Sequence, residues 1–161
     1  MKPQDIQNTI RSFLYLVEKG TGSIEGNEKM LSLVIDRLSV ASHYRIYNLT
    51  NRPLPSPPEH DNDALHELVS ERFPNFGYYN SPEYIVRNVA NTECLVGDAI
   101  DDIVDIALDM YSVEWYWRNS SGRTALHYFE DQYRNHWGIH LRQLQLYLFA
   151  EMRRNGAAVV R

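Results

Sequence analysis

Apolar residues recur at three- and four-residue spacing in several separate stretches of the chain, as they do on the buried face of an amphipathic helix. The first stretch follows Pro3, which suits the first turn of a helix, and ends at Gly20 and Gly22. The second begins near Asn27, a residue type suited to helix capping, and is apolar around most of its circumference. We therefore expect two N-terminal helices, with the second helix in the centre of a bundle.

The middle of the chain has a different pattern. Four prolines between residues 53 and 58 disfavour helix and predict an exposed, extended loop over 51–62 rather than a ligand for proline-binding domains. A short helix is expected over residues 63–73. The aromatic-rich run 73–83 predicts a second exposed loop, which we expect to lie over the core because its rings are costly to leave in water.

Two long helical patterns fill the C-terminal half. One runs from near Asp98 to about Arg118, and a break at 119–122 separates it from a second helix that we expect from Thr124 to Arg154. Such a short connection makes the two helices antiparallel neighbours. The sequence therefore predicts an all-α fold, a single-domain bundle of four to five helices with a proline- and aromatic-rich middle.

Composition narrows the class of protein. The 161 residues are 43% hydrophobic and 23% charged, which is typical of one globular domain over residues 1–161. A net charge of -5 disfavours binding to nucleic acid, and the single Cys94 excludes an internal disulfide. No apolar run approaches the roughly 20 residues of a membrane span, and the N-terminus has no signal-peptide pattern. We expect a cytoplasmic protein without membrane contact, and nothing in the sequence indicates an oligomeric state.

Five aspartates lie on the predicted helix that starts near residue 98. At about 100° per residue, four of them fall within one narrow arc, opposite the apolar face. We interpret this acidic face as solvated, and the alternatives are a divalent metal site or a docking face for a basic protein partner. The four residues in the arc are Asp98, Asp102, Asp105 and Asp109, and the fifth is Asp101.

His136 and His140 have the four-residue spacing with which a helix offers two imidazoles to one metal ion. Both border the apolar stripe of their predicted helix, so we expect hydrogen-bonded structural histidines; a metal pair or a pH-sensitive contact is the alternative. If the two long helices pack through their apolar stripes, the aspartates point away from the histidines. Asp101 is then the only aspartate expected to approach them, and a combined site is not expected.

Three further positions are candidates for binding. Arg45 falls on the apolar stripe of the second helix and is expected to form an internal ion pair or a pocket wall. Tyr78 and Tyr79 belong to the aromatic run and are candidates for contact with a ligand or partner. Gly138 lies inside a predicted helix, where glycine costs about 1 kcal/mol relative to alanine, and this indicates close approach of another segment or a slight bend.

The second half of the chain resembles a known bacterial family. The series Val96–Ile106 and the run from Phe129 through His136-Trp-Gly-Ile-His-Leu141 are similar to the domain-of-unknown-function family numbered 5063. The resemblance implies a small helical bundle of bacterial origin with no known activity. Five residues belong to the family pattern by this resemblance: Asp102, Asp105, Trp137, Gly138 and His140.

No phosphate-binding loop or nucleophile motif occurs in the sequence. We therefore expect a non-catalytic interaction or adaptor domain that contacts a protein partner through the acidic helix face or the aromatic loop, with no cofactor. The alternative is a metal-dependent hydrolase or small-ligand-binding protein that uses a divalent metal, His136, His140 and a nearby carboxylate.

Overall fold

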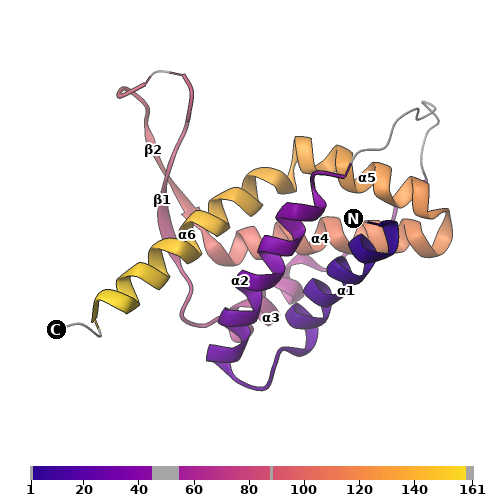
Figure 1. Ribbon diagram of the computed structural model, residues 1–161, viewed down its shortest axis with the longest axis horizontal. Helices are drawn as coiled ribbons and strands as arrows, with labels where there is room; N and C mark the ends of the chain where they lie inside the picture. The colour runs from indigo at the N-terminus through magenta and orange to yellow at the C-terminus, as the bar shows by residue number, and fades with distance from the viewer. Residues whose placement is uncertain (1, 45–54, 88, 159–161) are drawn as a thin grey trace.

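A computed structural model describes residues 2–44, 55–87 and 89–158 and shows a mainly helical protein (Figure 1). These residues form six helices and one antiparallel pair of strands. The mainly helical class is therefore confirmed, whereas the helices outnumber the predicted four to five and the strands were not predicted. The elements are α1 (Pro3–Lys19), α2 (Ile24–Ala41), α3 (Asn62–Arg72), β1 (Tyr78–Pro82), β2 (Cys94–Asp98), α4 (Ala99–Asn119), α5 (Gly122–Asn135) and α6 (Trp137–Ala158).

Helix α4 is the centre of the fold, because α1, α3, α5 and α6 all contact it. Its side chains Ile103, Ile106 and Met110 are fully buried. The prediction that α2 is the central helix is wrong. Helix α2 lies at the edge of the fold, mainly against α1 and α6, and leaves the apolar side chains of Leu33 and Val40 exposed.

Polar side chains fix the start of α2 and join it to α3. Ser23 is the capping residue, since its Oγ accepts a hydrogen bond from the backbone NH of Gly26 at 3.1 Å. Asn27, the predicted cap, lies inside the helix instead. Its Oδ1 accepts a hydrogen bond from the NH of Thr21, and its Nδ2 donates to the carbonyl of Arg72, so it connects the α1–α2 turn to the end of α3.

The predicted single helix from Thr124 to Arg154 is divided at His136 into α5 and α6. Gly138 explains why the chain can divide into two helices at this point. A Cβ atom there would lie 2.0 Å from the carbonyl oxygen of Tyr133, so only glycine allows the start of α6 to pass this close to the end of α5. The buried indole of Trp137 donates to the carbonyl of Phe129 at 3.1 Å and fixes the two helices to each other. The predicted close approach of another segment at Gly138 is confirmed, and that segment is the end of α5.

Strands β1 and β2 form a hairpin that extends away from the helices (Figure 1). The prediction of an exposed loop over 73–83 is therefore wrong in two respects: part of it is a strand, and Phe73 is fully buried. Tyr79 pairs with Gly97 in the register of the strands. A Cβ atom on Gly97 would lie 2.4 Å from the ring of Tyr79, so this glycine leaves room for the ring.

Other predicted boundaries agree with the structure. Helix α1 begins at Pro3 and ends before Gly20, and α3 and α4 lie within one residue of their predicted bounds. Of the predicted loop 51–62, residues 51–54 lie outside the described part of the chain, and residues 55–61 contain no helix or strand. No described helix combines the length and the apolar composition needed to cross a membrane.

Candidate metal centre

The acidic face of α4 lies against α6, and it is not solvated along its length. Asp102 and Asp109 are only 4% and 6% exposed. The prediction that the aspartates point away from the histidines is therefore wrong. Other helices surround α4, so its polar face also packs against a neighbouring helix. Helix α6 lies over this face, and both histidines point toward the carboxylates.

His140 is held by two carboxylates from successive turns of α4. Its Nδ1 lies 2.8 Å from Oδ1 of Asp102, and its Nε2 lies 3.4 Å from Oδ2 of Asp105. The hydroxyl of Tyr79, at the base of the hairpin, donates to the other oxygen of Asp102 at 2.5 Å. Asp102 is therefore fixed from both sides, by a tyrosine from β1 and by a histidine from α6.

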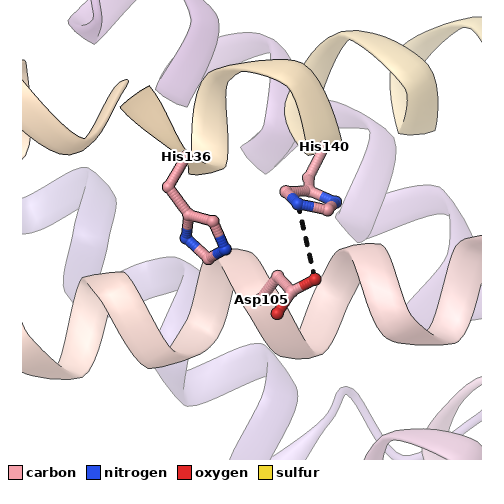
Figure 2. Close-up of side chains that lie close together, drawn as sticks. All are labelled: Asp105, His136 and His140. Atoms are coloured by element: carbon pink, nitrogen blue, oxygen red, sulfur yellow. Dashed lines mark ion pairs between the residues drawn. The ribbon is translucent and has the colours of Figure 1, made fainter. Parts of the chain in front are cut away.

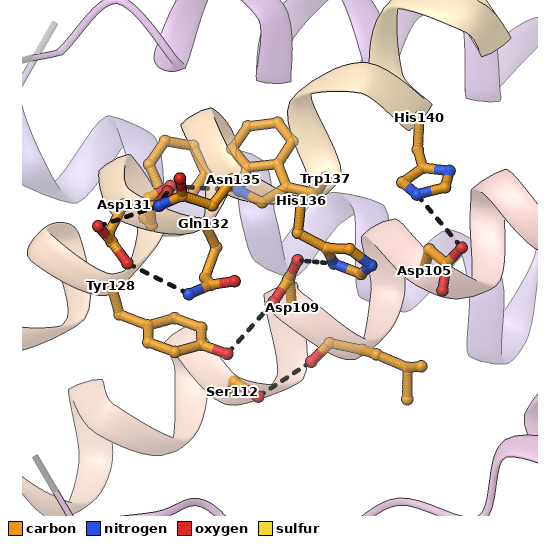
Figure 3. A network of polar contacts seen from close by, with 12 residues as sticks. Asp105, Asp109, Ser112, Tyr128, Asp131, Gln132, Asn135, His136, Trp137 and His140 are labelled. Carbon is orange, nitrogen blue, oxygen red and sulfur yellow. Dashed lines mark hydrogen bonds and ion pairs between the residues drawn. The ribbon is translucent and has the colours of Figure 1, made fainter. Parts of the chain in front are cut away.

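His136 has a similar environment one turn earlier. Its Nδ1 lies 2.8 Å from Oδ2 of Asp109, and the hydroxyl of Tyr128 donates to Oδ1 of the same carboxylate at 3.2 Å (Figure 3). His136 lies at the junction between α5 and α6, and its backbone NH donates to the carbonyl of Gln132. Two Tyr–Asp–His chains thus converge on the same region from opposite directions.

Asp105 completes the group (Figure 2). One ligand atom from each of Asp105, His136 and His140 lies within 4.8 Å of the other two. The ligand atoms of a tetrahedral ion with bond lengths of about 2.0–2.2 Å lie roughly 3.3–3.6 Å apart. Side-chain rotations that shorten these separations by at most about 1.5 Å would bring the three groups onto one ion.

The buried aspartates also determine which imidazole nitrogen is free to bind. When Nδ1–H donates to a carboxylate, the proton is fixed on Nδ1 and the lone pair is on Nε2, and this arrangement orients histidine ligands in many metal sites. Asp102 and Asp109 impose it on His140 and His136 respectively. Figure 3 shows the second ring nitrogen of His136 directed away from Asp109, toward the side on which His140 lies. The chemistry of the group therefore suits a divalent transition metal.

The electrostatics of the group agree with its geometry. The hydrogen bond to Asp102 raises the pKa of His140, against the effect of burial, and the nearby aspartates add to the rise. Burial raises the pKa of Asp109 even though His136 acts in the opposite direction. Burial and then Asp109 raise the pKa of Tyr128 to about 12, while burial and Asp102 raise that of Tyr79, so both phenols remain hydrogen-bond donors at neutral pH.

The remaining candidate residues lie elsewhere. Asp98 caps α4, since its Oδ1 accepts a hydrogen bond from the NH of Ile100. Asp101, expected to be the aspartate nearest the histidines, pairs instead with His66 on α3 at 3.2 Å. Tyr78 is exposed and takes no part in the centre. Arg45 lies outside the described residues.

His66, Asp98 and Asp101 form a second group that could hold an ion, but two of its three members are exposed. His136 and His140 are each oriented by a buried aspartate. The carboxylate that contacts His66 is exposed, so it does not hold this imidazole in the same way. The centre at Asp105 is therefore the better candidate, and the second group provides a matched control for it.

The contacts of Tyr79 and Tyr128 with the buried aspartates were not predicted from the sequence. The spacing of the other residues contained a usable signal: Asp102 and Asp109 are seven apart, Asp105 lies between them, and the histidines are four apart. Antiparallel helices can align such sets, with Asp102 opposite His140 and Asp109 opposite His136.

No family model, curated protein or solved structure matches this chain, so the interpretation of the centre rests on its own geometry.

Proposed function

We propose that the protein binds one divalent transition-metal ion through Asp105, His136 and His140 and acts as a metal-dependent hydrolase. The observation that carries the proposal is the pair of buried aspartates, because each orients one histidine and leaves its Nε2 available. Two imidazoles and one carboxylate form a ligand set that suits Zn²⁺, Mn²⁺ or Fe²⁺.

The exposure of the ligands supports a catalytic rather than a purely structural ion. The side chains of His136 and Asp105 are 44% and 33% exposed, so an ion there remains accessible to solvent. Structural zinc sites close the coordination shell with four protein ligands, whereas catalytic sites have three and leave a position for water. A divalent ion supplies an acidified water for hydrolysis in such sites.

The resemblance to family 5063 fits this assignment. Among the five residues that carry it, Asp105 and His140 are proposed ligands and Asp102 orients His140. Trp137 and Gly138 form the α5–α6 junction, and His136 and His140 on either side of it both face aspartates of α4. We propose accordingly that the pattern marks a metal-binding bundle of bacterial origin that acts in the cytoplasm.

Metal binding is tested by calorimetric titration of metal-free protein with Zn²⁺, Mn²⁺ and Co²⁺. We expect one ion per chain and an increase in the unfolding temperature, because a ligand that binds only the folded state stabilises it. Asp105→Asn and His140→Ala should weaken binding by more than roughly 100-fold, the upper end of the effect of supporting residues. His66→Ala is the control and should bind like the wild type.

The outcomes separate the alternatives. Absence of binding by any of the three ions would overturn the metal assignment, and loss of binding in His66→Ala would transfer it to the second group. Hydrolysis is tested with nitrophenyl esters and phosphates, where we expect turnover that EDTA abolishes and Zn²⁺ or Mn²⁺ restores. Binding without metal-dependent turnover on such substrates would contradict the hydrolase assignment and leave the protein as a metal-binding module.

A further inference from the structure

The hairpin ends in an apolar tip that no described part of the chain covers. Ile85, Val86 and Val89 are 75%, 84% and 82% exposed, and the tip lies far from the helices (Figure 1). An isolated two-stranded hairpin is only marginally stable in water, and a cluster of exposed apolar side chains typically marks a contact surface. The tip is therefore a candidate surface for contact with another molecule.

A groove that is also lined by exposed apolar side chains lies between α2 and α6. It has a volume of about 660 Å³, within the range of roughly 300–1,000 Å³ found for pockets that hold small ligands. Leu33, Phe149 and Met152 line it, and each is 48% or more exposed. Its apolar floor is thus open to solvent.

Charge distinguishes the groove from an ordinary apolar surface. Four acidic side chains and one lysine line it. The tip carries an exposed arginine between its apolar residues, and Glu83 and Glu93 flank it at the base. This arginine, Arg87, forms no ion pair or hydrogen bond with the described residues. The acidic residues of the groove are Glu25, Glu28, Asp36 and Glu151.

The tip cannot fill the groove of its own chain. The groove lies beside the first half of α2 and the second half of α6, and the hairpin points away from these segments (Figure 1). A second copy of the chain supplies both surfaces at once. If each tip enters the groove of the other copy, the two contacts are related by a twofold axis and the assembly closes as a dimer.

We infer that the protein forms a twofold dimer by arm exchange, in which the hairpin tip of each copy occupies the acidic, apolar α2–α6 groove of its partner. Val86 and its neighbours cover the apolar floor, and Arg87 pairs with the acidic residues of the groove. Neither surface includes the ligands of the candidate metal centre, so the inference is independent of the proposed function.

Sedimentation velocity and light scattering of the purified full chain test the inference, and a dimer is expected. Val86→Asp in the tip and Met152→Asp in the groove should each give a monomer, because each destroys both equivalent contacts. Val40→Asp is the control, since this exposed residue of α2 lies outside the groove. Unchanged circular dichroism and unfolding temperature would show that the variants still fold.

Mixing the two monomeric variants sharpens the test. The mixture contains one intact tip and one intact groove, so a heterodimer with one contact should form although neither variant associates alone. Arg87→Glu should also weaken the dimer, and adding Glu151→Arg to it should restore association. A monomeric wild type, a dimer that persists in Val86→Asp or Met152→Asp, or a tip that binds a different protein or a lipid vesicle instead would overturn the inference.

Discussion

Asp102 and Asp109 lie seven residues apart on α4, and each accepts a hydrogen bond from one of the two histidines of the candidate centre at 2.8 Å. The carboxylates are two helical turns apart on α4, whereas the ring centroids of His136 and His140 are 5.2 Å apart. The centre is therefore supported from both ends by buried groups that are not themselves proposed ligands.

Asp102→Asn and Asp109→Asn should each lower metal affinity by about 10- to 100-fold, because an amide no longer holds the imidazole in the binding tautomer as a carboxylate does. Calorimetric titration with Zn²⁺ measures the change. Asp101→Asn, on the same helix but paired with His66, is the control and should leave affinity unaltered. Equal affinities in all three variants would show that the buried aspartates are not part of the centre.

Tyr79→Phe should destabilise the fold by roughly 1.5–3 kcal/mol, the usual contribution of a hydrogen bond to a charged group. It removes the only donor that β1 offers to Asp102 among the described residues, at 2.5 Å. Urea unfolding measures the free energy of unfolding, and zinc titration should show a parallel loss of affinity. Tyr78→Phe affects an exposed ring on the opposite face of the strand, so an equal effect there would contradict the explanation.

Metal-free protein should lose stability as the pH rises above about 6.5. The raised pKa of His140 means that the folded state binds this proton more tightly than the unfolded state does. The resulting stabilisation is complete below the unfolded pKa of about 6.5 and disappears as the pH passes through the raised pKa of the folded state.

Urea unfolding at a series of pH values measures this loss, and the comparison with Asp102→Asn isolates the contribution of His140. The variant lacks the carboxylate that is the main cause of the shift, so its stability should depend less on pH. With Zn²⁺ present the trend should reverse, since the ion competes with the proton for the imidazole. Identical pH profiles for wild type and variant would refute the assignment of the shift to Asp102.

Gly138→Ala should destabilise the protein, although alanine is favoured over glycine inside helices by about 1 kcal/mol. The added methyl group would lie 2.0 Å from the backbone carbonyl oxygen of Tyr133, which cannot move without displacing the end of α5. Thermal unfolding should show a drop in the midpoint and zinc titration a weaker centre. Gly77→Ala, where nothing lies within 4 Å of the new Cβ atom, serves as the control.

The sequence was sufficient for those parts of the fold that depend on local chemistry. Pro3, Gly20 and the apolar spacing predicted α1, and α4 was expected to begin near Asp98, as it does, because helix ends depend on a few neighbouring residues. The division at His136 was missed because it depends on the contact between Gly138 and Tyr133, which the periodicity of the apolar residues does not express.

The centre was missed for a related reason. Helical phase correctly placed Asp102 and Asp109 opposite the main apolar stripe, but it cannot show whether another helix covers that side. We predicted that the polar face of α4 is exposed to solvent. A polar helix face is exposed in this way only when the helix lies at the edge of a fold. Helix α4 is surrounded, so its carboxylates became buried partners of α6.

The contact between Tyr79 and Asp102 joins the hairpin to the centre, and it implies thermodynamic reciprocity between them. Tyr79 belongs to β1, so a displacement of the strands shifts the carboxylate that orients His140. If the centre binds an ion as we propose, a molecule that displaces the hairpin would change metal affinity by some factor, and the ion would change the affinity for that molecule by the same factor. Tyr79 would then transmit occupancy of the centre to the hairpin.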